Sequence, residues 1–133
     1  NLGKKLTLTL NNLIDKNRKP FVEKSSSFLK IIDEISSNMY GATAVIQDNI
    51  IVGVITDGDI RRVIEKKQNI ENISASDFMN KNPKIMTENT LAIEALKHMK
   101  ENRISQVLII DSSNVYLGIV HILDIIKEGV NNE

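Results

Sequence analysis

The chain of 133 residues contains one internal repeat, and this repeat restricts the possible folds more than any other feature of the sequence. Residues 31–38, IIDEISSN, align with residues 95–102, ALKHMKEN, at an offset of 64 residues. Residues 53–62, GVITDGDIRR, align with residues 118–127, GIVHILDIIK, at an offset of 65 residues. We therefore expect two copies of one structural unit.

Both copies predict the same order of elements, which is a strand, a helix, two strands and a helix. In the first copy, Ser26 or Ser27 can cap a helix whose apolar residues recur at spacings of three and four, namely Phe28, Ile31, Ile32 and Ile35. The elements that follow it are predicted strands at residues 42–47 and 50–55, joined by a turn at Asp48-Asn49, and a helix at residues 58–66. The second copy predicts a helix at residues 90–102, strands at 106–110 and 115–120, and a helix at 122–128. Short apolar stretches beside prolines predict one more strand ahead of each copy, at residues 20–22 and 83–86.

A sheet of three strands with helices on one face leaves its other apolar face uncovered. We therefore expect an α+β fold in which two βαββα repeats pack sheet to sheet about a pseudo-two-fold axis, with clefts where the repeats meet. The predicted organisation is a linker at residues 1–10, a first repeat at 11–70 and a second repeat at 71–133. The polar residues 66–76 connect the repeats and lead into a short predicted helix at 77–80.

The composition argues against several classes of function. The 17 basic and 17 acidic residues give a formal net charge of zero, so the chain lacks the field that would hold a nucleic acid or an anionic membrane surface. With no cysteine and two histidines, it has no thiol nucleophile and few ways to build a metal site. Its longest apolar runs, of about six residues, are too short to span a membrane, and its start does not resemble a signal peptide. We therefore expect a cytoplasmic protein.

The segment Gly53-Val54-Ile55-Thr56-Asp57-Gly58-Asp59 runs from the end of the predicted strand at residues 50–55 into the last helix of the first repeat. A repeated βαββα unit that ends in such a G-h-h-T-x-x-D motif resembles the CBS (cystathionine-β-synthase type) domain, which occurs in tandem and binds adenosyl or other nucleotides. The resemblance covers about residues 11–129. It implies a nucleotide-binding module.

Three segments resemble more narrowly the CBS pair at the C-terminus of the arabinose 5-phosphate isomerases: LGKKL at 2–6, TDGDIRR at 56–62 and GIVHILDIIKEGV at 118–130. In that family, an N-terminal sugar isomerase (SIS) domain interconverts ribulose 5-phosphate and arabinose 5-phosphate for Kdo and lipopolysaccharide or capsule synthesis. The resemblance implies that LGKKL follows such a domain, and that the catalytic part of the protein lies outside this chain.

The first motif can bind a phosphorylated nucleoside. Thr56 closes a predicted strand and Asp59 opens a helix, so a hydroxyl, a carboxylate and free backbone N–H groups converge at one point. A phosphate can bind these N–H groups and the Thr56 hydroxyl, while Asp59 can accept hydrogen bonds from the two hydroxyls of a ribose. At least one of Arg61 and Arg62 can reach a phosphate tail. The base is expected against strand backbone and apolar side chains near Pro20, and the residues predicted to line it are Phe21, Val22 and Thr43.

The same residues allow a purely structural interpretation. Thr56 and Asp57 can simply cap the helix, with Asp59 favourable to its dipole and both arginines solvated. A calcium loop is disfavoured, because basic and apolar residues stand where a twelve-residue loop needs oxygen ligands, namely Arg61, Val63 and Lys66. We therefore predict no metal site and leave capping open as the alternative to ligand binding.

The second motif keeps only part of the pattern. Asp124 corresponds to Asp59, but His121 replaces Thr56 and Ile126-Lys127 replaces the two arginines. His121 can donate to a phosphate or a sugar carboxylate, or it can be a partly buried histidine at a strand end with one backbone partner. We therefore expect one good site and one altered or empty site, with His121 and Asp124 as the candidate residues of the latter.

Catalytic motifs are missing from the sequence, including the G-x-S-x-G elbow, the P-loop and the G-x-G-x-x-G loop. We therefore expect a non-catalytic regulatory CBS pair that requires no cofactor and binds AMP, ATP or a nucleotide-sugar such as CMP-Kdo. The alternatives are a stand-alone CBS-pair sensor, the regulatory segment of a sugar-nucleotide transferase, and an enzyme that acts alone. The apolar helix residues expected to join copies into a homo-oligomer are Ile60, Val63, Ile64, Ile122, Ile125 and Ile126.

Overall fold

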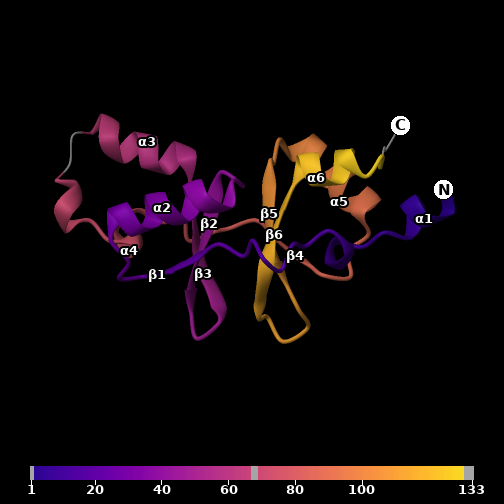
Figure 1. Cartoon of the computed structure of the whole chain (residues 1–133), viewed down its shortest axis with the longest axis horizontal. Coiled ribbons are helices and arrows are strands. Elements are labelled where there is room, and N and C mark those ends of the chain that lie inside the picture. The colour runs from indigo at the N-terminus through magenta and orange to yellow at the C-terminus, as the bar shows by residue number, and fades with distance from the viewer. Residues whose placement is uncertain (1, 67–68, 131–133) are drawn as a thin grey trace. The chain divides into compact units, whose positions relative to one another are not determined.

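The structure, a computed structural model, describes residues 2–66 and 69–130. Its elements up to the middle of the chain are α1 (Leu2–Thr7), the 3-10 helix η1 (Leu10–Asn12), β1 (Phe21–Glu23), α2 (Phe28–Asn38), β2 (Ala42–Gln47), β3 (Ile50–Thr56), α3 (Asp57–Glu65) and the 3-10 helix η2 (Ile70–Asn72). The remaining elements are α4 (Ala75–Phe78), β4 (Ile85–Thr87), α5 (Ala92–Asn102), β5 (Gln106–Ile110), β6 (Tyr116–His121) and α6 (Ile122–Lys127) (Figure 1). The order βαββα occurs twice, with one three-stranded sheet in each copy, so the expected α+β fold is confirmed.

The two sheets have the same topology. In each, the first strand runs parallel to the second, and the second is antiparallel to the third. In the first sheet, Phe21 pairs with Ala44, and Ala42 pairs with Thr56. Thr56 therefore lies at the end of the sheet where β2 begins, whereas the hairpin turn between β2 and β3 lies at the opposite end. The packing of the two sheets on each other stays a prediction.

The chain divides into two compact units, one formed by residues 18–83 and the other by residues 1–17 together with 84–133. The predicted boundaries of the sequence repeat, at residues 10 and 70, fall at different positions and stay a prediction. The compact units therefore do not coincide with two successive lengths of chain. A short segment near the start of the chain belongs to the unit that contains the second sheet.

Backbone hydrogen bonds hold this early segment in place. The Leu10 N–H donates to the Thr90 carbonyl over 2.9 Å, and the Ala92 N–H donates to the Leu8 carbonyl over 2.7 Å. Leu10 is completely buried. It belongs to the hydrophobic core of this unit, together with buried residues of α5, β5 and β6. Leu8 and Leu10 are therefore part of the fold of the second unit, and the linker predicted at residues 1–10 stays a prediction.

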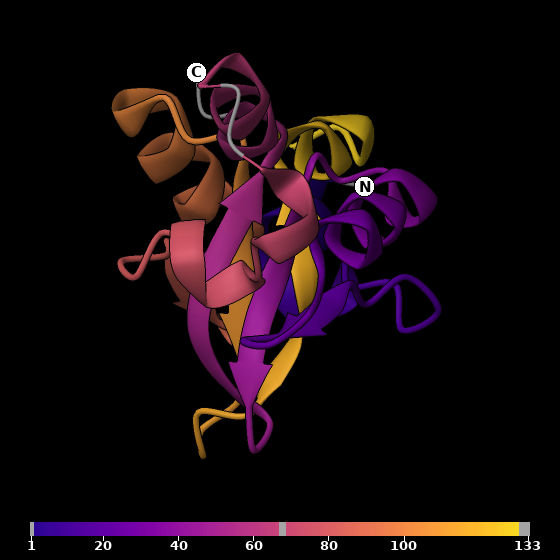
Figure 2. The same cartoon turned by 90° about the vertical axis from the view of Figure 1, so that its left-hand side faces the viewer.

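The unit of residues 18–83 uses α4 in the same way, 65 residues later in the sequence. The Ala75 N–H donates to the Ser26 carbonyl and the Ser76 N–H to the Lys24 carbonyl, each over 3.0 Å. Ala75, which corresponds to Leu10, is also completely buried. Figure 2 shows α4 in front of the β2–β3 strands. The helix predicted at 77–80 was placed too late, because the chain turns into the helix already after Ser74.

The glycine of each motif allows a chain segment to cross its sheet closely. A Cβ atom on Gly53 would lie 2.6 Å from Met79 Sδ and 3.1 Å from the Asn80 carbonyl oxygen. The Asn80 segment is held there by a bridge to Val54, with N–O distances of 3.0 and 2.9 Å. Gly118 lies in the left-handed region at φ 150°, and a Cβ atom there would lie 3.0 Å from Ile14 Cγ2. Both repeat glycines therefore have a structural role.

The core of the first unit lies between its sheet and α2. Its buried residues are Val22, Ile31, Ile35, Val45, Ile55 and Ala75. Ser27 is the N-cap of α2, since its side chain accepts a hydrogen bond from the Lys30 N–H over 3.2 Å. The predicted apolar stripe of this helix and its serine cap are thus confirmed.

Candidate functional site

Thr56 and Asp59 form a reciprocal cap at the N-terminus of α3. The Thr56 N–H donates to Asp59 Oδ2 over 2.9 Å, and the Thr56 hydroxyl lies 3.1 Å from the same oxygen. In return, the Asp59 N–H donates to Thr56 Oγ1 over 3.3 Å. The structure thus brings the two central residues of the first motif together and gives them a capping role. Asp57, the other predicted capping residue, is exposed and takes no part in this exchange.

Arg62 occupies the other oxygen of the Asp59 carboxylate. Its Nη2 lies 2.5 Å from Asp59 Oδ1, one helical turn away. The Asp59 side chain is 17% exposed and the Arg62 side chain 59% exposed. The guanidinium lies over Gly58, where Nη1 is 3.4 Å from the position that a Cβ atom would take. Both carboxylate oxygens of Asp59 therefore already have partners within α3 and its cap.

Arg61 lies apart from this group. It forms an ion pair with Glu65, with Nε and Oε1 3.5 Å apart, and both side chains are largely exposed. Of the two arginines in the motif, only Arg62 contacts the Thr56–Asp59 cap in the structure.

A hollow of about 250 Å³ opens beside Asp59 and Arg62, between α3 and α4. Its other lining residues are Val63, Lys66, Asp77 and Phe78. Lys66 and Asp77 were not among the predicted site residues. Lys66 could have been found from its spacing of four residues after Arg62, which places the two on one face of a helix. Asp77 carries no such local signal, because α4 reaches this place only through the tertiary fold.

The three residues predicted to line the base point in two directions. Val22 and Thr43 are 2% and 0% exposed, on the side of the sheet that also carries Val45 and Ile55. The Thr43 hydroxyl donates to the Ala44 carbonyl over 3.1 Å. These two side chains are therefore enclosed in the structure. Only the backbone atoms of Val22 and Thr43 would be left to contact a base.

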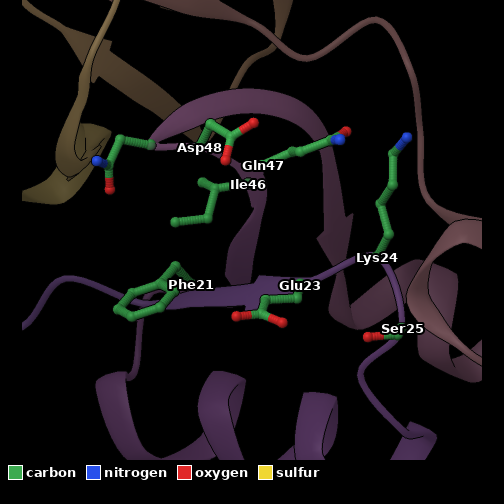
Figure 3. Close-up of a pocket in the computed structure, with 8 residues that line it drawn as sticks. Phe21, Glu23, Lys24, Ser25, Ile46, Gln47 and Asp48 are labelled. Carbon is green, nitrogen blue, oxygen red and sulfur yellow. The ribbon is translucent and has the colours of Figure 1, made fainter.

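Phe21 is the exposed member of that set, at 44%. It stands on the opposite face of β1 from Val22, and it borders a cavity of about 480 Å³ near the hairpin turn (Figure 3). Since β1 and β3 lie on either side of β2 and Phe21 is level with Val54, two residues before Thr56, Phe21 and Thr56 are about 12 Å apart across the sheet. The structure does not bring Phe21 into contact with the cap at Thr56.

The second motif forms a similar cap with different chemistry. The His121 N–H donates to Asp124 Oδ2 over 2.9 Å, and the Leu123 N–H donates to His121 Nδ1 over 3.0 Å. The imidazole therefore accepts a hydrogen bond at Nδ1, which leaves Nε2 to carry the proton of the neutral ring. Lys127 stands at the position of Arg62, and no ion pair to Asp124 is present in the described part of the chain.

Residues 2–66 and 69–130 contain no group of three or more His, Asp or Glu side chains arranged to hold a metal ion. Within the same residues, no helix is both long and apolar enough to cross a membrane.

The sequence is similar to those of arabinose 5-phosphate isomerases. It is 37% identical over 127 residues to arabinose 5-phosphate isomerase KdsD of Francisella tularensis, a match that covers 95% of this chain and 39% of the relative. It is 31% identical over 131 residues to KdsD of Escherichia coli K12, covering 97% of this chain and 40% of the relative. The chain thus spans about two fifths of the length of these relatives.

Solved structures with the same fold include CBS-pair proteins. The CBS domain protein PAE2072 from Pyrobaculum aerophilum, complexed with AMP, is 16% identical, with a TM-score of 0.78 over 88% of this chain and 89% of that chain. The CBS-pair protein CBSX2 from Arabidopsis thaliana is 17% identical, with a TM-score of 0.77 over 92% of this chain and 94% of that chain. The family model of the CBS domain matches residues 14–66 and 75–131, which together make up most of the sequence. The chain belongs to the CBS domain family.

Proposed function

We propose that the chain is the regulatory CBS pair of an arabinose 5-phosphate isomerase, and that it binds a nucleotide or nucleotide-sugar without being catalytic itself. The observation that carries this proposal is the similarity to KdsD over nearly the whole chain but only about two fifths of the relative. The remaining length of such a relative is enough for a separate SIS domain, which would interconvert ribulose 5-phosphate and arabinose 5-phosphate. We also propose that this reaction serves Kdo, lipopolysaccharide or capsule synthesis.

The ligand site of the proposal is the N-terminus of α3. Asp59 is placed to accept hydrogen bonds from ribose hydroxyls, each a charge-assisted contact of about 1.5 to 3 kcal/mol. Because Arg62 holds Asp59 Oδ1, a ribose that binds there must share this oxygen or displace the guanidinium. A displaced Arg62 can pair with a phosphate bound near the N-terminus of α3. Such a phosphate would compete for the N–H groups of Asp57 and Asp59, which donate to the Gly41 carbonyl and to Thr56 Oγ1 in the structure.

The ligand class is a nucleotide, with AMP and ATP as generic candidates and CMP-Kdo as an end-product candidate. AMP is supported by the AMP complexes of two proteins with this fold, from Pyrobaculum aerophilum and the CBSX2 protein. The second motif, with His121 and Asp124, would be an altered site. It lacks the arginine that completes the first, so its affinity for a phosphate is expected to be lower.

The regulatory effect would pass through the N-terminal segment to the SIS domain. A ligand can shift the arrangement of the attached domain only by as much as its affinities for the two arrangements differ. Residues 1–17 belong to the unit with the second sheet, so the connection to the SIS domain would leave from that unit. The direction of the effect, inhibition or activation, would follow from which arrangement binds the ligand more tightly.

A homo-oligomer is proposed through the outer helices. Ile64 on α3 is 56% exposed, and Leu123 and Ile126 on α6 are 62% and 45% exposed. Val63 and Ile125, which were predicted to take part, are 5% and 0% exposed and face their own cores instead. The exposed residues supply the apolar surface for contact between copies. We also propose that the protein resides in the cytoplasm.

A thermal-shift panel of AMP, ATP, CMP, CTP and CMP-Kdo tests the function. A ligand at 100 times its dissociation constant stabilises the folded state by about 2.7 kcal/mol, which corresponds to several degrees in Tm for a domain of this size. We expect at least one nucleotide to raise Tm by that amount. No shift with any of the five would contradict nucleotide binding, and turnover of ribulose 5-phosphate by this chain alone would contradict the non-catalytic role.

The alternatives, a stand-alone CBS-pair sensor or the regulatory segment of a sugar-nucleotide transferase, predict the same binding but a different neighbour in the gene. Reading the coding sequence upstream of Asn1 distinguishes them: a SIS domain supports the proposal, and a stop codon or a transferase domain contradicts it.

A further inference from the structure

A cavity of about 480 Å³ lies at the hairpin end of the first sheet, and of the residues predicted for the nucleotide site only Phe21 lines it. It is lined by residues of β1 and the turn that follows it, and by the end of β2 with its hairpin turn: Phe21, Glu23, Lys24, Ser25, Ile46, Gln47, Asp48 and Asn49 (Figure 3). This volume falls in the range of small-molecule sites. Since β3 runs for seven residues from the hairpin to Thr56, the hairpin turn is about 20 Å from the cap of α3 along the strand, whereas Phe21 at the other side of the cavity is about 12 Å from it.

The cavity has an apolar part and a charged part. The Phe21 ring and the Ile46 side chain form the apolar part, and Phe21 and Glu23 point to the same side of β1 because they are two residues apart (Figure 3). The carboxylates of Glu23 and Asp48 outnumber the single ammonium group of Lys24. None of these three charged side chains takes part in the ion pairs found among the described residues.

The backbone holds this lining in a defined geometry. Asp48 and Asn49 both adopt the left-handed conformation, with φ of 54° and 67°, as in a two-residue hairpin turn. The β1 edge is also closed, because the Phe21 N–H donates to Glu34 and the Glu23 N–H donates to Ser26 Oγ, each over 2.9 Å. Because these N–H groups already have partners, the β1 edge is not available to pair with another strand. A small molecule is therefore a better candidate than an extended peptide to occupy the cavity.

We propose that this cavity binds a small organic cation that carries a primary ammonium group next to an apolar body. An exposed aromatic face attracts a cation through its quadrupole, and carboxylates accept the hydrogen bonds of an ammonium group. The excess of one negative charge over the lining selects a cation over a neutral or anionic molecule of the same shape. This site shares Phe21 with the predicted base lining, but its charged residues are distinct from Thr56, Asp59 and Arg62, and it does not depend on the proposed nucleotide site.

Three probes with the same ring test the charge preference: phenethylammonium, neutral 2-phenylethanol and anionic 3-phenylpropionate. Each is titrated into the 133-residue chain while the amide signals of Glu23, Asp48 and Asn49 are followed by NMR. We expect saturable shifts with phenethylammonium, binding about tenfold weaker with the alcohol, and no saturation with the acid. Equal binding of the cation and the alcohol, or no saturation with the cation, would overturn the proposal.

Matched variants locate the site. Glu23→Gln and Asp48→Asn keep the size of each side chain, and asparagine tolerates the left-handed backbone at position 48. Each is expected to weaken phenethylammonium binding about threefold and the double variant about tenfold, while Asp33→Asn on the exposed side of α2 leaves it unchanged. Unchanged binding by the double variant would overturn the proposal, as would a loss of AMP binding that accompanies the loss of the cation, because the two sites would then not be separate.

Discussion

Arg62 Nη2 lies 2.5 Å from Asp59 Oδ1, about one turn back along α3. Arg62 belongs to the last turn of α3, but its guanidinium reaches back over Gly58 toward the N-terminus, where the macrodipole favours negative charge and the Asp59 carboxylate neutralises the cation. The same cation would be favourable if an anion bound at the helix N-terminus. In the proposed site, Arg62 would thus have two alternative partners, the Asp59 carboxylate without ligand and a phosphate with it.

Replacement of Arg62 is therefore expected to change the affinity for the phosphate and the affinity for the nucleoside in different ways. In Arg62→Gln, AMP should bind about tenfold more weakly, because a charge-assisted contact to the phosphate is lost. Adenosine, which has no phosphate, should bind as well as before or more tightly, because Asp59 Oδ1 no longer pairs with the arginine. Isothermal titration of the variant and the unchanged chain with AMP and with adenosine measures both changes in affinity.

Arg61→Gln is the matched control, since Arg61 pairs only with the exposed Glu65. It should leave the affinities for AMP and adenosine unchanged. An equal loss of AMP affinity in both variants would mean that the arginines act only through general charge, and an unchanged AMP affinity in Arg62→Gln would exclude the phosphate contact.

The glycine of the first motif is expected to be needed for stability. In Gly53→Ala, the new methyl group would meet Met79 Sδ at 2.6 Å and the Asn80 carbonyl at 3.1 Å, and this backbone oxygen is fixed by its bridge to Val54. We expect a loss of about 1 to 3 kcal/mol in the free energy of unfolding, measured with urea.

Gly58→Ala serves as its control. The nearest atom outside the adjoining residues, Arg62 Nη1, lies 3.4 Å from the added Cβ position, and the residue lies in α3. The change should be neutral or should stabilise by up to about 1 kcal/mol through helix propensity. If Gly53→Ala and Gly58→Ala had the same stability, the close approach of the Asn80 segment to Gly53 would not explain a loss of stability in Gly53→Ala.

The early segment of the chain is expected to stabilise the second unit. Leu10→Ala removes a completely buried side chain from the core of that unit and should cost about 2 to 5 kcal/mol. Leu6→Ala, at a position that is 46% exposed on α1, should cost far less. Urea unfolding followed by the NMR signals of α5 and β5 measures both, and equal stabilities would contradict the structural role of the segment.

His121 is expected to act as a helix cap even without a ligand. His121→Ala removes the acceptor of the Leu123 N–H and should destabilise the unit by about 1 kcal/mol, whereas His121→Thr restores a capping side chain of the type at Thr56 and should retain most of the stability. Thermal unfolding of both variants tests this. A threonine variant as unstable as the alanine variant would speak against capping.

Much of the fold could be predicted from the sequence, because the repeat and the apolar spacing are local signals. The spacing of Ile31 and Ile35 indicates the buried face of α2, and Ser27 supplies its cap. The segment around Leu10 joins the unit of the second sheet, and the segment around Ala75 joins the unit of the first sheet. This arrangement was not predicted, because both segments are short and their hydrogen-bond partners are distant in the sequence. Only the tertiary fold shows which sheet each segment joins.

The candidate site was predicted in part for the same reason. Thr56 and Asp59 are three residues apart and open a helix, so their contact follows from local geometry. The ion pair of Arg62 with Asp59 is also local, but the sequence leaves open which partner the arginine takes. The enclosure of Val22 and Thr43 depends on which face of the strands α2 covers, and a short apolar strand does not reveal this.

The most direct test compares AMP binding by Asp59→Asn and Asp124→Asn, measured by isothermal titration under identical conditions. Asparagine can still accept the Thr56 or His121 N–H at each cap, so each helix start is preserved while the negative charge is lost. The account predicts that Asp59→Asn weakens AMP binding at least about tenfold and that Asp124→Asn changes it little. An unchanged affinity in Asp59→Asn would contradict nucleotide binding at the first motif.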